Sequence, residues 1–194
     1  NILTLSGAST YTGSTVISSN ATLNLTGSLG ATAVTVVGYG GIGGTGFVGS
    51  GGSLTFRQLA KLKIKMSGGS LTVNGNVDLG PKTTVVVDVT QTPVMGSPIP
   101  VLDYTGTLTG ATAQLTIASS SYRKSEFIFT PGHIALDLGT KSLIWKGASG
   151  YEWLVGGTKL WNTAGIGETE SFYQGDSVRF DDTGSNYVTS YQTL

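Results

Sequence analysis

The sequence predicts an all-β protein whose many short strands stack as the coils of a β-solenoid. Hydrophobic residues recur with a period of two along most of the chain, which is typical of strands. Glycine-rich turn signals separate these segments every few residues and leave little room for helices. The 194 residues include 30 glycines but only 11% charged residues, whereas ordinary soluble domains carry about a quarter. Pattern and composition together favour short strands joined by tight turns over a disordered chain.

In chain order, the clearest alternating segments are residues 2–5, 21–25, 71–73, 83–90, 114–118 and 133–138. The turn signals between them include Ser6-Gly7, Thr12-Gly13, Thr26-Gly27, Thr105-Gly106 and Pro131-Gly132. One segment, Phe56 to Leu62, is long enough for two helical turns. Residues 62–66 alternate directly after it, so this region is predicted to be strand as well.

Three architectures fit many short strands: a sandwich, a closed barrel and a solenoid. Hairpins call for tight two-residue loops, and Asn74-Gly75 is the one good signal for such a loop. Elsewhere the strands carry Thr, Ser and Asn on one face and Val, Leu and Ile on the other, at intervals close to those of solenoid coils. Stacked coils bury a continuous apolar core that a single coil cannot form, so the solenoid is favoured.

Several segments resemble a known repeat family. Residues 3–17 read LTLSGASTYTGSTVI and are similar to the autotransporter-associated β-strand repeat, while residues 69–80 read GSLTVNGNVDLG and resemble a coil common in such passengers. Residues 145–184 resemble the opening of a further repeat block. The resemblance implies a right-handed parallel β-helix and an open-ended repeat array. Residues 1–140 would form its coils, and residues 141–194 would form the Trp-containing opening of the next block.

The same resemblance implies a structural or adhesive passenger segment, secreted or displayed at the outer cell surface, with no catalytic activity and no cofactor. Its partners would be further copies of itself, laterally or end to end, or a surface glycan or protein. Membrane attachment would come only from a C-terminal barrel that this chain does not contain. Neither end of the array would carry a cap, so the terminal coils would fray or associate. The alternative is a carbohydrate-active β-helix enzyme, either a polysaccharide lyase or a glycosidase.

Charge and cysteine content exclude several further classes of protein. Eleven basic and eleven acidic residues cancel, so no overall field attracts nucleic acid. The absence of cysteine removes disulfide scaffolds and thiol catalysis, and it is compatible with export.

Leu54 to Met66 departs from the family pattern, since Arg57 and three lysines replace what is often a Gly/Pro-rich turn. We expect a bulge or an insertion in this coil. Lys61, Lys63 and Lys65 share one face of the alternating strand and form the only basic cluster. They either contact an anionic glycan or acidic partner, or protect an exposed sheet edge from aggregation, and the second interpretation is the simpler one.

Residues 38–43 spell GxGxxG, the pattern of a dinucleotide-binding loop. That loop needs a following helix and an acid about 20 residues later, whereas a glycine-rich stretch follows here and no Asp or Glu precedes Asp78. We therefore interpret it as a glycine-rich coil corner.

His133 is the only histidine, and strand parity places it with Asp137 on the polar face, which favours a wall residue over a catalytic one. The acids are scattered along the sequence, whereas a lyase or glycosidase needs two or three acids that converge in space. Asp176, Asp181 and Asp182 lie close together in the sequence. They are interpreted as turn caps, with calcium binding as the secondary possibility.

Trp145, Trp153 and Trp161 lie at equal intervals along the sequence. Such a row either stacks on sugar rings or packs into successive coils, and packing is favoured because each ring buries a large apolar area.

Overall fold

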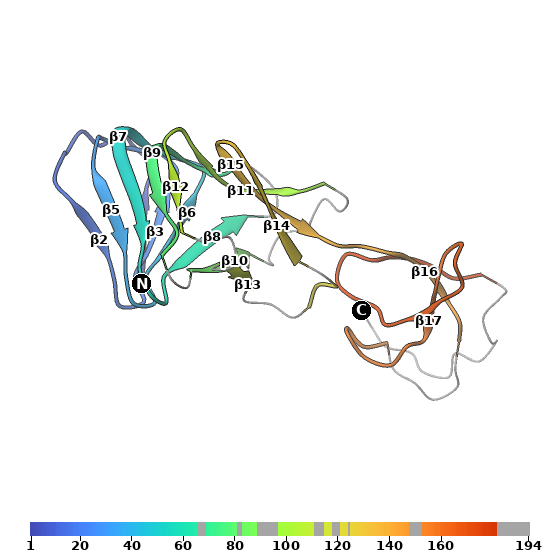
Figure 1. Cartoon of the computed structure of the whole chain (residues 1–194). Helices are drawn as coiled ribbons and strands as arrows, with labels where there is room; N and C mark the ends of the chain where they lie inside the picture. Colours follow the sequence, from blue (N-terminus) through green and yellow to red (C-terminus); the bar gives the residue numbers. More distant parts are fainter. Residues whose placement is uncertain are drawn as a thin grey trace. The chain divides into compact units, whose positions relative to one another are not determined.

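The structure is a computed structural model. It describes residues 1–65, 69–80, 83–88, 97–110, 115–117, 121–123, 125–147 and 153–181. The chain forms two compact units, the first of residues 1–119 and 127–137, the second of residues 120–126 and 138–194 (Figure 1). All regular elements in the described residues are strands, and most of those in the first unit stack in parallel as a β-solenoid. The predicted fold class is confirmed.

Two sheets line the solenoid. The six-stranded sheet has the order β1 (Ile2–Leu5), β3 (Thr22–Leu25), β6 (Gly41–Gly44), β8 (Lys61–Lys65), β10 (Thr83–Asp88) and β13 (Leu115–Ile117). The nine-stranded sheet has the order β14 (Ser125–Thr130), β15 (His133–Leu138), β11 (Ile99–Tyr104), β9 (Leu71–Asp78), β7 (Phe47–Phe56), β5 (Ala33–Val36) and β2 (Thr15–Ile17). The short strands β12 (Leu108–Thr109) and β4 (Ser28–Leu29) pair with β9 and β7.

The register shows that the first coils are nearly equal in length. In the six-stranded sheet, Ile2 pairs with Thr22, Thr22 with Gly41, and Gly41 with Lys61. The next coil, from Lys61 to Thr84, is slightly longer. A nearly constant repeat length therefore governs the N-terminal part of the solenoid.

Leu54 to Lys65 keep this regular register, so the expected bulge in that segment is wrong. Leu54 pairs with Val34 and Lys61 pairs with Gly41, so both sheets advance by the same interval through this coil. The irregularity lies just before it, between Val48 and Gly52 of β7, where the register against β9 shifts. Extra residues of β7 are accommodated there because glycines at the shift allow the backbone to bend.

The core consists of apolar ladders that run from coil to coil. Leu23, Ile42 and Leu62 occupy one ladder and are buried. Leu3 belongs to the same ladder but is 60% exposed. Burial in this ladder therefore begins at the second coil.

Tight turns join the two sheets after β2, β5 and β7, and they stack on one another. Asn20, Tyr39 and Leu59 occupy the equivalent position in successive turns, with φ of 62°, 61° and 65°. The Tyr39 amide donates to the Leu59 carbonyl in the next turn (3.1 Å). The predicted glycine-rich corner is confirmed at Gly38-Tyr39, while Gly41 to Gly44 form a strand.

Antiparallel pairing ends the parallel stack of the nine-stranded sheet. Pro131-Gly132 connects β14 to β15, and β15 pairs antiparallel with β11, with Asp103 opposite His133. The parallel arrangement expected from the sequence therefore extends to β11 and not to this hairpin. By contrast Asn74-Gly75, the best hairpin signal, lies inside the continuous strand β9.

The second unit is a small mixed sheet of β18 (Thr169–Glu170), β17 (Trp161–Thr163), β16 (Ser142–Trp145) and β19 (Ser177–Arg179). The β16–β17 and β17–β18 pairs are antiparallel, and only the β16–β19 pair is parallel. These strands are not successive solenoid coils. The expectation that the three tryptophans pack into successive coils is therefore wrong in this respect.

Candidate functional site

The lysine cluster lies on the outer face of an interior strand. Strand β8 pairs with β6 on one side and with β10 on the other. Leu62 and Ile64 are buried in the core, whereas Lys61 and Lys63 alternate with them and are half-buried outside; for Lys65 the structure describes only the backbone. The interpretation of these lysines as edge protection is wrong, because the edges of β8 are already hydrogen-bonded.

Glycines on the neighbouring strand make room for the lysine stems. Gly41 and Gly43 pair with Lys61 and Lys63. A Cβ placed on Gly41 would lie 3.4 Å from Cε of Lys63 and 3.7 Å from Cβ of Lys61. A Cβ placed on Gly43 would collide with the backbone of Lys63. Both lysine stems therefore border the same side-chain-free strip of β6.

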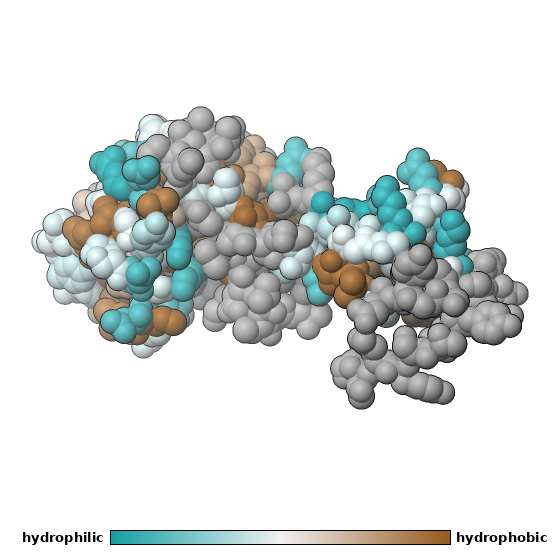
Figure 2. Space-filling model, turned by 90° about the horizontal axis from the view of Figure 1, so that it is seen from below, coloured by the Kyte–Doolittle hydropathy of each residue, from teal (hydrophilic) through white to brown (hydrophobic). Residues whose placement is uncertain are grey.

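Tyr39 completes this group, and sequence reasoning missed it. Tyr39 is 52% exposed, and the Lys61 ammonium nitrogen lies 5.7 Å from the ring centroid, within cation–π range. Figure 2 views the solenoid from the side where β5 and β7 end, and hydrophilic and hydrophobic residues are interspersed there. Tyr39 stands in the turn after β5, so only the coil register reveals its proximity to β8.

The three tryptophans form one aromatic cluster in the second unit. Ring centroids of Trp145 and Trp153 lie 4.9 and 5.1 Å from that of Trp161, with edge-to-face geometry. Phe172 and Phe180 join the cluster, and Trp161 is buried beside Leu143 and Leu160. These contacts agree with packing as the role of Trp145 and Trp161, while Trp153 packs against the same cluster and is 40% exposed.

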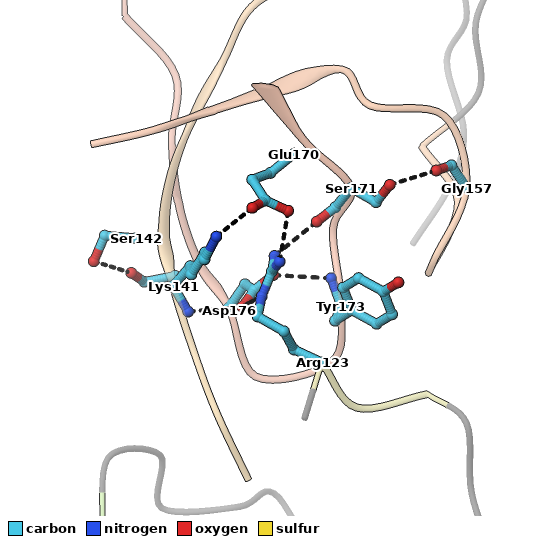
Figure 3. A network of polar contacts seen from close by, with 9 residues as sticks. Arg123, Lys141, Ser142, Gly157, Glu170, Ser171, Tyr173 and Asp176 are labelled. Atoms are coloured by element: carbon cyan, nitrogen blue, oxygen red, sulfur yellow. Dashed lines mark hydrogen bonds and ion pairs between the residues drawn. The ribbon is translucent and has the colours of Figure 1, made fainter. Parts of the chain in front are cut away.

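A polar network around Arg123 is the other dense site (Figure 3). The side chain of Asp176 is fully buried and accepts hydrogen bonds from two guanidinium nitrogens of Arg123, at 3.2 and 2.6 Å. It also accepts from the backbone amides of Lys141 (2.8 Å) and Tyr173 (2.9 Å). Four donors therefore satisfy this carboxylate, which is what a buried charge requires.

Arg123 holds Glu170 and the β18–β19 connection in the same network. Its guanidinium donates to Glu170 (2.8 Å) and to the carbonyl of Ser171 (2.7 Å), and it lies 4.9 Å from the centroid of the Tyr173 ring. Lys141 pairs with the second oxygen of Glu170. Arg123 thus connects segments that are 47 to 53 residues apart in sequence.

These contacts shift the ionisation of both partners. The hydrogen bond from Lys141, helped by Arg123, outweighs desolvation and lowers the pKa of Glu170. Burial alone would lower the pKa of Arg123, but its hydrogen bonds to Asp176 and Glu170 raise it. Both groups are therefore charged at neutral pH, as a structural ion-pair network requires.

Asp176 has the predicted role of a turn cap, because its carboxylate accepts a hydrogen bond from the backbone amide of Tyr173, three residues earlier. Asp181 pairs with Arg179 at 2.9 Å, and Asp182 lies outside the described residues. Within the part of the chain that the structure describes, no group of three or more His, Cys, Asp or Glu side chains is placed to hold a metal ion.

His133 is on the outer face, as parity predicts, with Ile134 and Leu136 buried between it and Asp137. Its Nδ1 contacts one carboxylate oxygen of Asp103, and the Ser70 hydroxyl donates to the other. The carboxylate therefore lies between the hydroxyl and the imidazole. A Ser-His-Asp triad requires the imidazole in that middle position.

A scan against protein-family models found no match to this chain, and searches of curated proteins and of solved structures found none either. Among the described residues, no helix is long and apolar enough to cross a membrane.

Proposed function

We propose that this chain is a structural and adhesive scaffold, a passenger segment of a surface-displayed, autotransporter-like protein without catalytic activity. The repeat-like segments at residues 3–17 and 69–80 and the stacked coils support this proposal. A solenoid presents flat sheet faces whose length grows with the number of coils, which suits extended contacts with another surface.

The observation that carries the proposal is the position of the lysines. Lys61 and Lys63 lie on an interior strand, where sheet pairing already prevents edge association. Charge on the outer face of such a strand has no protective role and costs some β-propensity. Lys61 and Lys63 instead offer a contact surface for an anionic partner, which supports the proposal.

Adhesion to intact cells tests the proposal. Beads coated with the chain should bind bacterial or host cells above beads coated with an unrelated protein of similar size and charge. Binding should weaken with rising salt, because ionic contacts are screened. Equal retention of both bead types would contradict the proposal. Release of soluble fragments from pectin, glycosaminoglycan or bacterial polysaccharide would instead favour the enzyme alternative.

A further inference from the structure

We propose that Tyr39, Lys61 and Lys63 form a binding site for an acidic polysaccharide, a chain of sugars that carry carboxylate or sulfate groups. This inference rests on the proposed adhesive function and names the ligand class for its contact surface. Tyr39 would stack on a sugar ring, and the two lysines would pair with the acidic groups along the chain.

The first support is geometric. Lys61 and Lys63 are two residues apart on one face of β8, so their Cα atoms are separated by roughly 6.6 Å along the strand. Gly41 and Gly43 on the adjacent strand carry no side chains. Both glycines are buried and the stem of Lys63 lies close to Gly41, so the lysine stems cover this strand and a sugar chain meets their two ammonium groups.

The second support is the charge of the lysines. Among the residues that the structure describes, neither Lys61 nor Lys63 forms an ion pair, whereas Arg57 in the preceding turn pairs with Asp78. Two cations on one face without a carboxylate partner attract an anion.

The third support is Tyr39, which distinguishes a glycan from other anions. Its backbone is in the left-handed region, where most side chains are unfavourable, and this turn directs an aromatic ring outward beside Lys61. An exposed ring with a polar tip offers a stacking surface for the apolar face of a pyranose. Phosphate groups of a lipid or duplex nucleic acid would use the lysines but would gain nothing from this ring.

Binding to polygalacturonate and heparin, compared with neutral dextran, tests the inference. The Lys61→Gln/Lys63→Gln variant should bind both acidic glycans at least about tenfold more weakly, since two ionic contacts are lost. Tyr39→Asn keeps a residue that tolerates the turn and should lose a few-fold in affinity. Lys146→Gln/Lys159→Gln removes the same charge from exposed positions of the second unit and should bind normally.

Several results would overturn the inference. One is an affinity for dextran equal to that for the acidic glycans. Another is unchanged binding both by Tyr39→Asn and by Lys61→Gln/Lys63→Gln. The third is equally tight binding of the protein to duplex DNA and anionic vesicles. Circular dichroism of each variant confirms that folding is intact. If the chain adheres to cells but ignores acidic glycans, this inference fails and the scaffold proposal stands. If it binds acidic glycans specifically but does not adhere to cells, the scaffold proposal fails alone.

Discussion

At the scale of single residues, backbone strain is concentrated in the stacked turns. Leu59 has φ of 65° and accepts this conformation in the turn closed by the hydrogen bond from the Ala60 amide to the Arg57 carbonyl (3.1 Å). A leucine in the left-handed region costs roughly 1–2 kcal/mol, whereas Asn and Gly adopt it readily. The equivalent positions hold Asn20 and Tyr39, so the turn geometry and not the side chain is shared.

We expect Leu59→Asn to raise the free energy of unfolding by about 0.5–1 kcal/mol, because the strain falls while only a partly exposed side chain is lost. Urea denaturation followed by circular dichroism measures the change. Leu59→Ala is the control, since it removes the side chain and keeps the strain. Equal stability of the Asn and Ala variants would show that the turn stores no strain at this position.

The Arg123–Asp176 pair gives a sharper prediction. Replacing Arg123 with Met leaves the carboxylate of Asp176 buried without its counter-ion, which costs about 3–5 kcal/mol. Tryptophan fluorescence should report loss of the folded second unit at low urea. Arg179→Met is the matched control, because Arg179 pairs with Asp181 on the surface and such pairs contribute at most about 1 kcal/mol. Similar losses in both variants would contradict a special role for Arg123.

Glu170 makes the second unit sensitive to acid. Its pKa is lower in the folded protein than the ordinary glutamate value of 4.5, so its contribution to stability is present above that pH. The contribution is lost as the pH falls through the folded-state pKa. The urea midpoint from tryptophan fluorescence should therefore fall between pH 5 and pH 3. Glu170→Gln should flatten this part of the profile, and an unchanged slope would contradict the assignment.

At the scale of elements, glycines set how closely neighbouring coils approach. A Cβ on Gly75 of β9 would collide with the carbonyl oxygen of Gly52 in β7, and both residues lie in paired strands. Neither strand can move away without breaking its backbone hydrogen bonds to the neighbouring strands. The glycine of the apparent Asn-Gly turn is thus required for packing between coils and not for a reversal of the chain.

Gly75→Ala should destabilise the solenoid by about 1–3 kcal/mol, as expected for overpacking against backbone. Gly13→Ala is the control, because a Cβ there meets nothing within 4 Å. Thermal melts followed by circular dichroism compare the melting temperatures of the two variants. Equal melting temperatures would show that the coils move apart easily.

At the scale of the whole molecule, the chain contains two cores with different chemistry. The solenoid core is aliphatic, with Phe56 as its largest buried side chain, whereas all three tryptophans lie in the second unit. Tryptophan fluorescence therefore reports on the second unit alone. Circular dichroism in the far ultraviolet reports on the strands of both units.

Urea unfolding should consequently give different midpoints by these two probes, since each unit has its own core and its own free energy of unfolding. Arg123→Met should shift the fluorescence midpoint and leave the solenoid part of the dichroism transition in place. Coincident transitions that move together in this variant would show that the two units unfold as one.

Several features followed from the sequence alone. Alternation at Leu62, Lys63 and Ile64 predicts a strand with lysines outward, because the side-chain period of a strand is two whatever its neighbours are. The same argument placed His133 and Asp137 outside. Glycine spacing predicted the tight corner at Gly38-Tyr39, whereas the equivalent corners at Asn20 and Leu59 hold positive φ without a glycine.

Other features were decided only by the tertiary structure. Strand alternation is the same at an edge and in the middle of a sheet, so only the coil register shows that β8 is interior and that Tyr39 lies beside Lys61. Arg123 and Asp176 are 53 residues apart, and no local sequence pattern predicts their pairing. Local periodicity fixes which way a side chain points, whereas its partners depend on contacts between distant segments, which form only when the chain folds.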